Sequence, residues 1–507
     1  MDVVVSNMAW FQKSQLGPGR VATLKDLLVV VPKVFSGYTE DDTPTAPTRV
    51  VCYRETPELF GVPRAYFRDN AKESHLVTYQ TSPGRPVSLQ SSVRMTGRYI
   101  EQATAVDTLV STLQSRDQCM LKARPGWGKT NVALEVYRRL GVTGVVLVHK
   151  EFLMKQWIRR AAKVLPGIKI GIVREKKCQF EGYDLVVAMM ESLALEDGHR
   201  YPKEFYRWPG FVIVDEAHRA AAPSFSKAAP LFDARYRLAV TATPRRLDGA
   251  EDVFRWHLGQ IAYDAKTEMP KPTVWVVKAP LLGMSAEVVE ATGKAIVTTA
   301  LSKLSLRNRR IVRVLLKLVQ GPSERKVMVI GHRLEQLRDL KESFETCCRT
   351  AGLGVTTGVY TGEWWTGRFK KKTLASGVEV EVEVRAKLKE ADLEAAESAR
   401  VLFSTYQMVA EGLDIPALDT IIFATPSGDV EQSVGRTQRF CVATEEDGAP
   451  EKCARLCPWR AGKCLEKPMP LVVDLVDRGV RMSEVREGYR RDFYRSIGAK
   501  VIDPPKH

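Results

Sequence analysis

The stretch Ala123-Arg-Pro-Gly-Trp-Gly-Lys-Thr130 decides the fold that we predict for this chain of 507 residues. It follows a strand-like run, Gln118–Ala123, and it precedes a helical pattern, Asn131–Leu140. A glycine-rich turn between a buried strand and a helix is typical of proteins in which helices connect parallel strands. The stretch therefore favours an α/β fold over an all-helical or all-strand one.

The glycines of this stretch explain why it can bind phosphate. Gly126 and Gly128 let backbone N–H groups curl around an anion, and the helix that begins after them adds a partial positive charge. Lys129 can reach the β and γ phosphates of a nucleotide, and the Thr130 hydroxyl can hold Mg²⁺. We interpret the stretch as a P-loop with Ala123 in place of the usual first glycine. The alternative is a chance glycine-rich turn before a helix.

Two regions of the chain alternate short apolar runs with helical patterns. The runs expected as strands are Gln118–Ala123, Gly144–His149, Asp184–Ala188, Phe211–Val214 and Arg237–Thr241 in the first region, and Lys326–Ile330, Val401–Ser404, Thr420–Ala424 and Leu471–Leu475 in the second. We predict the α/β class with two parallel-sheet lobes, because parallel strands need crossover helices. The predicted domains are a small N-terminal accessory domain (1–96), a first lobe (97–270), a connector (271–306) and a second lobe (307–507).

Charge and composition narrow the class of partner. The formal net charge is +16 and the pI is near 9.4, which favours a polyanionic partner over the alternative of a merely basic protein. No apolar run approaches the roughly 20 residues of a membrane span, and no secretory signal is visible. We therefore expect an intracellular, non-secreted protein with no membrane partner, whose nine cysteines are reduced thiols or metal ligands.

A second acidic motif supports a nucleotide site. The apolar run Phe211–Val214 ends in Asp215-Glu-Ala-His218. A carboxylate at the carboxyl end of a parallel strand lies where ligands bind in open α/β sheets. Asp215 suits Mg²⁺, usually through water, and Glu216 suits orienting and deprotonating the attacking water. Alone, an acidic strand end is more often a solvated turn, but with an upstream Gly-Lys-Thr it predicts a nucleotide hydrolase.

The order of these motifs resembles the superfamily-two helicases from about Arg98 to Asp477. The matching positions are Gln102, Gly126–Thr130 (motif I), Val148–Trp157 (Ia), Asp215–His218 (II), Thr241–Thr243 (III), Lys326–His332 (IV), Thr405–Pro416 (V) and Gln432–Arg439 (VI). Motif Ia lacks the proline usual in the family and has His149-Lys150 instead, which puts its strand contacts in doubt. The resemblance implies two RecA-like lobes, with motifs I to III on the first and IV to VI on the second.

Two details resemble the DNA-directed branch that includes XPB-type, RecG-type and UvsW-type motors. Motif VI begins with Gln432 rather than His, and motif III continues as Pro244-Arg-Arg-Leu-Asp-Gly249. Three sequence segments resemble segments of helicases of large cytoplasmic DNA viruses, including the poxvirus transcript-release type. These segments are Tyr53–Arg64, Trp256–Gly259 and Tyr406–Thr420.

The resemblance also implies roles for individual residues around ATP and Mg²⁺. Catalysis would involve Lys129, Asp215, Glu216, Arg436 and Arg439. The implied nucleotide contacts are Gln102, Pro125, Gly126, Trp127, Gly128, Lys129, Thr130, Gly412 and Asp414. Coupling of hydrolysis to movement would involve His218, Thr241, Thr243 and Gln432, and Mg²⁺ would lie at Thr130 and Asp215. Motif Ia, Ser192 and Ser404–Thr405 are the implied strand contacts.

We therefore expect an ATP-dependent DNA helicase or translocase, a nucleic-acid-stimulated ATPase acting in viral transcription, replication or repair. DNA is favoured over RNA, and transcription or replication proteins are further expected partners. If the protein is viral, we expect it in the host cytoplasm, the nucleus or the virion. The alternatives are a duplex translocase that releases transcripts or proteins without unwinding, an RNA helicase, and a non-enzymatic nucleic-acid scaffold. The sequence does not give polarity or oligomeric state.

Three features lie outside the motifs of the family. Phe369–Ala375 and Val378–Val384 flank Ser376-Gly377 and predict a β-hairpin in which Lys370–Lys372 face a row of glutamates. Such a hairpin could separate strands or contact phosphate, or it could be a solvated arm. The basic run Arg478–Arg495 could contact DNA or pack on the second lobe, and a solvated helix face is the alternative.

Four cysteines follow motif VI within one insertion. Four thiols could bind a structural Zn²⁺ tetrahedrally, but the spacing lacks a second close pair, so independent reduced thiols are the alternative. The four residues are Cys441, Cys453, Cys457 and Cys464.

Overall fold

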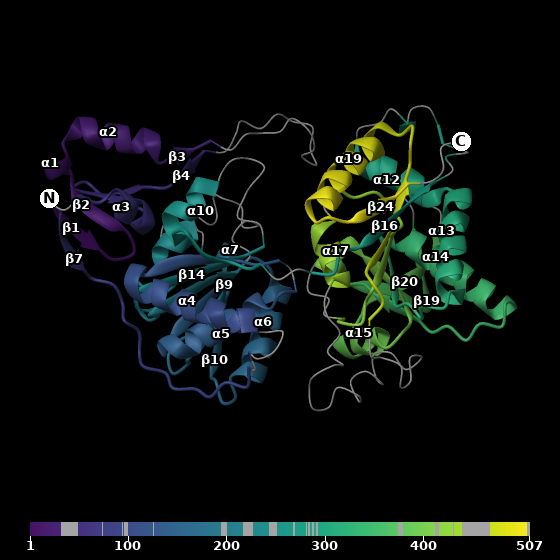
Figure 1. Cartoon of the computed structure of the whole chain (residues 1–507), viewed down its shortest axis with the longest axis horizontal. Coiled ribbons are helices and arrows are strands. Elements are labelled where there is room, and N and C mark those ends of the chain that lie inside the picture. The colour runs from purple at the N-terminus through teal and green to yellow at the C-terminus, as the bar shows by residue number, and fades with distance from the viewer. Residues whose placement is uncertain are drawn as a thin grey trace. The chain divides into compact units, whose positions relative to one another are not determined.

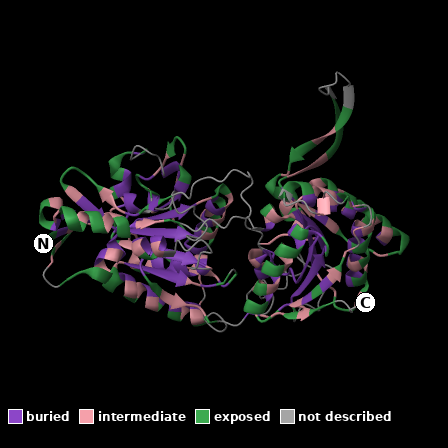
Figure 2. Cartoon of the chain, turned by 90° about the horizontal axis from the view of Figure 1, so that it is seen from above, coloured by how far each residue is buried: buried purple, intermediate pink, exposed green. Residues whose placement is uncertain are grey.

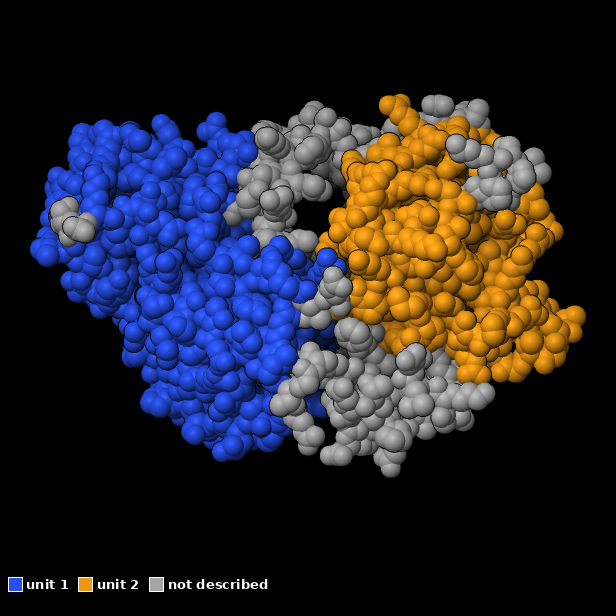
Figure 3. Space-filling model, viewed as in Figure 1, with its two compact units in different colours: residues 1–267 blue, residues 268–507 orange. Residues whose placement is uncertain are grey.

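The computed structural model contains two compact units, residues 1–267 and 268–507 (Figures 1 and 3). Each unit is built on a sheet whose strands are mainly parallel, which confirms the predicted α/β class. The described residues are 1–31, 49–72, 75–93, 95, 100–124, 126–193, 200–215, 227–242, 251–266, 269–279, 281, 284–285, 288–289, 293–373, 379–410, 415–428, 430–438 and 467–503.

The main sheet of unit 1 has eight strands in the order β11-β10-β12-β9-β13-β14-β8-β15. All neighbours are parallel except β10 and β11. The five strands expected from the sequence are present, and β10, β11 and β15 are additional. The bounds are β8 (Gln118–Lys122), β9 (Gly144–Val148), β10 (Ile170–Arg174), β11 (Lys177–Cys178), β12 (Leu185–Met189), β13 (Phe211–Asp215), β14 (Tyr236–Thr241) and β15 (Ile261–Asp264).

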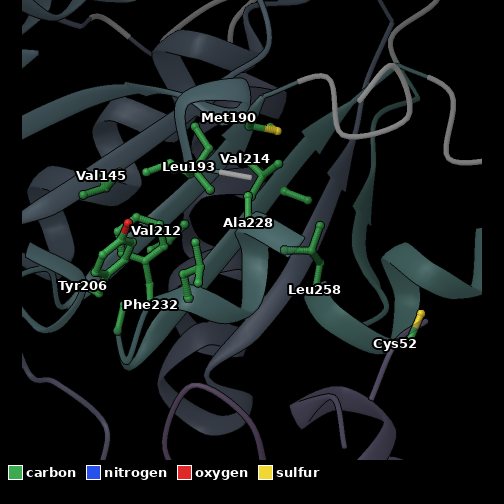
Figure 4. Packing of buried hydrophobic residues seen from close by; sticks show 14 of the residues in the cluster. Cys52, Val145, Met190, Leu193, Tyr206, Val212, Val214, Ala228, Phe232 and Leu258 are labelled. Carbon is green, nitrogen blue, oxygen red and sulfur yellow. The ribbon is translucent and has the colours of Figure 1, made fainter. Parts of the chain in front are cut away.

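Helices cover both faces of this sheet, so its central strands are buried on both sides. Alternate residues of one strand therefore enter different cores: Val212 packs in one, and Ile213 packs in the other. The first core, shown in part in Figure 4, receives Val145, Val214 and Leu258. The helices are α4 (Ile100–Arg116), α5 (Lys129–Leu140), α6 (Glu151–Val164), α7 (Met190–Leu193), α8 (Lys203–Arg207), η3 (Ala229–Leu231) and α10 (Glu251–Leu258).

A smaller sheet near the N-terminus also belongs to unit 1 and shares a hydrophobic core with the main sheet. Its strand order is β5-β6-β2-β1-β7, and Arg64 fastens it by donating to the carbonyl oxygens of Ala234 (2.7 Å) and Arg235 (2.8 Å). Arg237 donates in turn to Asn7 O (2.7 Å). The elements are β1 (Asp2–Val5), β2 (Ala9–Gln12), α1 (Lys13–Leu16), α2 (Pro18–Leu27), β3 (Val29–Val30), β4 (Val50–Val51), β5 (Arg54–Glu55), β6 (Leu59–Val62), α3 (Arg64–Asn70) and β7 (Leu76–Tyr79).

Unit 2 contains a fully parallel sheet of seven strands in the order β18-β21-β17-β22-β23-β16-β24. Helices cover both of its faces as well. The strands are β16 (Thr273–Lys278), β17 (Val327–Gly331), β18 (Thr357–Tyr360), β21 (Val401–Thr405), β22 (Thr420–Phe423), β23 (Leu471–Val476) and β24 (Lys500–Ile502). The helices are α12 (Lys294–Lys303), α13 (Ser305–Gln320), α14 (Leu334–Thr350), α15 (Glu390–Glu397), α16 (Tyr406–Ala410), α17 (Glu431–Thr437) and α19 (Arg481–Ser496).

The segment expected to be a connector, 271–306, differs from that expectation. It contains β16, which lies between β23 and β24 in the sheet of unit 2. Val274 and Val276 are buried in this strand, whereas Trp275 is exposed. The run is short and follows two prolines, so its alternation gave only a weak strand signal.

The predicted hairpin is present and is longer than expected. Strand β19 (Glu363–Thr373) pairs antiparallel with β20 (Glu379–Lys387), and the ribbon extends away from the body of unit 2 (Figure 2). The predicted facing of lysines and glutamates is largely wrong: Lys371 pairs with Glu381, but Lys370 and Lys372 pair with valines. The reason is strand alternation: successive side chains point to opposite faces, so three consecutive lysines cannot all face a row of alternate glutamates.

Candidate functional site

The phosphate loop begins where three neighbouring strands of unit 1 end. Strands β8, β14 and β13 are adjacent and parallel, so their carboxyl ends lie at one edge of the sheet. The loop follows β8, Thr241 ends β14 and Asp215 ends β13. The backbone N–H of Ala123 donates to Thr241 O (3.0 Å), which ties the start of the loop to the neighbouring strand.

The two glycines of the loop are required by its geometry. Gly126 has φ +83° and Gly128 has φ +107°, both in the left-handed region that L side chains rarely adopt. A Cβ on Gly128 would lie 2.6 Å from Nε2 of Gln102. No side chain caps the first turn of α5, which starts at Lys129. A helix start without a side-chain cap is suited to an anion.

Lys129 is buried at the start of α5 and folds back onto its own loop. Its Nζ donates to Ala123 O at 3.1 Å. Thr130, the next residue, is half-buried. The phosphate contact of Lys129 and the Mg²⁺ contact of Thr130 stay predictions.

Gln102 lies on α4 and contacts the loop directly. Its Nε2 donates to Trp127 O at 2.6 Å, and it is buried. The indole Nε1 of Trp127 donates to Glu101 Oε2 (3.1 Å). These bonds hold the loop against α4. The sequence did not single out Glu101, and its position beside Gln102 was the available signal. An adenine contact by Gln102 stays a prediction.

Asp215 has a partner that the sequence did not reveal. Nε1 of Trp157, a fully buried residue of α6, donates to Oδ2 of Asp215 at 2.7 Å. Buried tryptophan normally needs an acceptor for its N–H. An indole donor orients the carboxylate and carries no charge, so it does not neutralise Asp215. Trp157 lay within motif Ia, but sequence spacing could not show that it reaches motif II.

Two predicted strand contacts are buried and engaged within the protein. Ser192 Oγ accepts from Glu175 N (3.0 Å), and Ser404 Oγ donates to Tyr360 O (2.6 Å). Both hydroxyls therefore hold neighbouring backbone. A serine near a strand end can serve either role, and the sequence alone does not distinguish them.

Gln432 and Arg436 lie four residues apart on α17, so they share one face of that helix. Both are half-buried, whereas Ser433, Val434 and Gly435 pack inward. The helix therefore presents these two predicted residues together.

The basic C-terminal helix α19 packs on the sheet of unit 2, which was one of the predicted alternatives. Buried Arg490 donates to Asp474 Oδ2 (2.9 Å) and to Ser427 O (2.9 Å). Tyr494 donates to the same Asp474 oxygen (3.0 Å), and burial raises the pKa of Tyr494. Arg495, in contrast, is exposed and pairs with Asp492 on its own helix.

Several predicted site residues lie outside the described part of the chain. These are Pro125, Glu216, His218, Thr243, Gly412, Asp414, Arg439, Cys441, Cys453, Cys457 and Cys464. Among the described residues, no group of three or more His, Cys, Asp or Glu side chains could hold a metal ion. Neither the described residues nor the related helicases support a zinc site, so the zinc site stays a prediction. No helix in the described ranges is long and apolar enough to cross a membrane.

Comparison with known proteins agrees with the motif pattern. Residues 95–246 match the family model ResIII, described as type III restriction enzyme, res subunit. A protein of Acanthamoeba polyphaga mimivirus, L396, named as an ATP-dependent RNA helicase, is 25% identical over 76% of this chain and 69% of its own length. Protein D10 of Escherichia phage T5, named as a helicase, is 23% identical over 76% and 73%.

A third relative comes from another large DNA virus. Protein 109L of Invertebrate iridescent virus 3, named as a helicase, is 27% identical over 35% of this chain and 54% of its own length. Helicase relatives imply an enzyme that hydrolyses ATP with a divalent metal and binds nucleic acid. The family match and these relatives together support an assignment of the chain to the superfamily-two helicases of large DNA viruses.

Proposed function

We propose that this chain is an ATP-dependent DNA helicase or translocase that couples ATP hydrolysis to movement along nucleic acid. One observation carries the proposal: the phosphate loop, Thr241 and Asp215 meet at the carboxyl ends of three adjacent parallel strands. This edge is where open α/β sheets bind their ligands. The left-handed glycines and the buried lysine add a preformed cradle for phosphate.

In this proposal Lys129 exchanges its bond to Ala123 O for the β and γ phosphates. Trp127 and the N–H groups of the loop hold the phosphate chain, and Gln102 keeps the loop closed against α4 or reads the adenine base. The N–H groups of the first turn of α5 then face an anion rather than water. The described geometry of loop and helix supports these roles.

The residues present suit Mg²⁺. Thr130 and Asp215 supply hard oxygen donors, and the Trp157 indole orients the Asp215 carboxylate without placing a positive charge beside it. A bound Mg²⁺ would neutralise charge that develops on the phosphates. Glu216, next along the chain, would orient and deprotonate the attacking water.

The roles of the remaining motif residues rest on the family resemblance. Arg436 and Arg439 would stabilise the transferred phosphoryl group, and Gly412 and Asp414 would contact the nucleotide. The residues proposed to couple hydrolysis to movement are His218, Thr241, Thr243 and Gln432.

The competing functions use the same ATPase. A duplex translocase would release transcripts or proteins without unwinding, and the name of the mimivirus relative favours an RNA helicase as the second candidate. A non-enzymatic scaffold would have no need of Lys129, Asp215 and Glu216 together.

One set of assays separates these functions. ATPase activity is measured with single-stranded DNA, duplex DNA, branched DNA and RNA at matched length and salt, with Glu216→Gln as the inactive control. We expect DNA to stimulate hydrolysis more than RNA, and strand displacement to require ATP. Stronger stimulation by RNA would assign the protein to the RNA-directed branch. ATP-dependent release of a bound transcript without strand displacement would favour the translocase.

A further inference from the structure

One face of α13 carries a stripe of arginines above a hollow in unit 2. Arg309, Arg310 and Arg313 follow Leu306 at spacings of three, four and seven residues, so all four side chains share one face of the helix. With Lys278 and Ala279 they line a hollow of about 480 Å³. Lys278, the last residue of β16, and Ala279, which follows the strand, form the other wall.

Residues on the opposite face of α13 are buried and hold the helix, and with it the stripe, in place. Ile311 and Leu315 are buried in the core against the sheet. Arg307, which is fully buried, donates to both carboxylate oxygens of Asp477 (2.7 and 3.1 Å) and to Ala424 O. Asp477 follows β23 and Ala424 follows β22, so the start of α13 is anchored over the carboxyl ends of these strands.

The cations of this hollow lack counter-ions. The side chains of Lys278, Arg309, Arg310 and Arg313 make no hydrogen bond or ion pair with any residue that the structure describes. The sequence supplies no acid nearby on the helix, because Asp and Glu are absent between Glu290 and Glu324. Like charges three and four residues apart destabilise a helix, so this arrangement is unfavourable until an anion binds.

The neighbouring helix α14 shows that the pattern is particular to α13. On α14, Arg338 pairs with Glu342 and Lys341 pairs with Glu345, each at 2.7–2.8 Å. The two helices pack on the same core. On α14 acidic residues of the same helix offset the cations, whereas α13 carries no acidic residue.

The hollow lies at the edge of the sheet where ligands are expected. Lys278 ends β16, which runs parallel to β23 and, through β22, to the motif IV strand β17. His332 and Tyr406 follow β17 and β21 at the same edge and meet at Thr425, through His332 N to Oγ1 (3.0 Å) and Tyr406 Oη to O (2.6 Å). Motifs IV and V therefore share an edge with the stripe.

We infer that the α13 stripe and Lys278 form a binding site for the phosphate backbone of a nucleic-acid strand. Guanidinium groups bind phosphate through two parallel N–H donors, and such contacts do not depend on base sequence. The stripe from Leu306 to Arg313 extends about 10 Å along the helix, which suits consecutive phosphates better than one phosphate group. The inference rests on the proposed function, since it names the surface on which unit 2 holds the strand.

The test measures how nucleic-acid affinity depends on salt. The full-length chain is titrated without nucleotide against single-stranded DNA, duplex DNA and single-stranded RNA at several salt concentrations. A triple Gln variant of the stripe removes three charges: R309Q, R310Q and R313Q. Each lost phosphate contact lowers the slope of log affinity against log salt by about 1, so we expect a decrease of about 2 to 3.

Two further variants separate charge from folding. A triple Lys variant at the same positions keeps the charge and should retain the wild-type slope. A charge-matched control removes three arginines that have partners, and its slope should fall by less than about 1. The control substitutions are R349Q, R491Q and R495Q.

The outcomes distinguish this inference from the proposed function. If wild-type protein binds nucleic acid and the two Gln triples have equal slopes, the stripe is not the site and the proposed function stands. If wild-type protein shows no salt-dependent binding at all, both fail. If R309Q/R310Q/R313Q weakens ATP binding and leaves the nucleic-acid slope unchanged, the hollow is a nucleotide site and the inference is overturned.

Discussion

The two sheets of this protein consist mainly of parallel strands, but different structures lie at the carboxyl ends of their strands. In unit 1 the edge carries a glycine loop in which Lys129 donates to Ala123 O, and Asp215 accepts a hydrogen bond from the Trp157 indole. In unit 2 helices are anchored over the edge by buried ion pairs, Arg307 with Asp477 and Arg490 with Asp474.

This difference shows how one architecture can serve two kinds of anion. A loop with exchangeable bonds can admit a compact triphosphate, whereas a helix fixed by buried pairs can present a row of cations to a long strand. Unit 1 instead uses its buried arginines at the opposite edge, where Arg64 and Arg237 bind backbone carbonyls and hold the N-terminal sheet.

The largest effect should come from substitutions at the proposed ATP site, which lies at the carboxyl edge of the unit 1 sheet. Lys129→Ala and Glu216→Gln should each lower ATP turnover by a factor on the order of 10³ or more, because Lys129 holds the transferred phosphoryl group and Glu216 activates the attacking water. The Glu216 variant should still bind ATP. Steady-state hydrolysis and nucleotide binding measure this, with Lys169→Ala as a surface-lysine control. Near-normal turnover in either variant would refute the site.

In unit 2 the largest expected effect of a substitution is a decrease in the free energy of unfolding. Asp477→Asn leaves the Arg307 charge buried without its partner, which should lower the free energy of unfolding by about 3–5 kcal/mol. Glu342→Gln, which breaks an exposed pair with Arg338, should cost at most about 1 kcal/mol. Chemical denaturation of both variants provides the comparison. Equal losses would show that burial of the pair does not set its contribution.

The arginines of motif VI should affect the rate of ATP hydrolysis more than the affinity for ATP. Arg439→Ala should lower maximal ATP turnover by a factor on the order of 10², because such arginines stabilise charge that develops in the transition state. Nucleotide affinity should change far less. A parallel measurement of turnover and affinity decides between the two roles. Lost affinity with unchanged maximal turnover would make Arg439 a ground-state contact.

The core of unit 1 should make the protein sensitive to acid. Burial, together with the nearby charges of Arg237 and Arg54, lowers the pKa of His257 to about 3. Between an unfolded pKa of about 6.5 and that folded value, the unfolded state binds the extra proton, so stability falls as pH falls. His257→Gln should flatten this dependence by up to about 1.4 kcal/mol per pH unit. Denaturation at pH 7 and pH 5 measures the slope, and an unchanged slope would contradict the assignment.

The smallest effect should distinguish the two helices of unit 2. Arg310→Gln should stabilise the protein by a few tenths of a kcal/mol, because it relieves like-charge repulsion with Arg313. Lys341→Gln should destabilise it by a similar amount, because it breaks the pair with Glu345. Shifts in the thermal midpoint would report both signs. Destabilisation by both variants would mean that the stripe has a favourable partner in the free protein.

Local pattern was sufficient to predict much of this molecule. The runs from Gln118 to Thr241 predicted all five central strands of unit 1, because fully buried parallel strands are continuous apolar runs. Gly126, Gly128 and Lys129 predicted the phosphate loop, because a left-handed turn before a helix needs glycine at those positions. Strand β16 and the hairpin register were missed, since both are decided by partners far away in the chain.

The sequence by itself determined the two α/β lobes, the phosphate loop and the acidic strand end that follows Val214. Tertiary structure alone decided that Trp157 orients Asp215, that Gln102 holds Trp127, and that Arg307 anchors α13 beneath an unpaired arginine stripe. The physical reason is the distance along the sequence between the residues that decide each feature. Strand burial and backbone conformation depend on neighbouring residues, whereas a hydrogen bond between residues 58 or 170 positions apart depends on how the whole sheet brings its helices together.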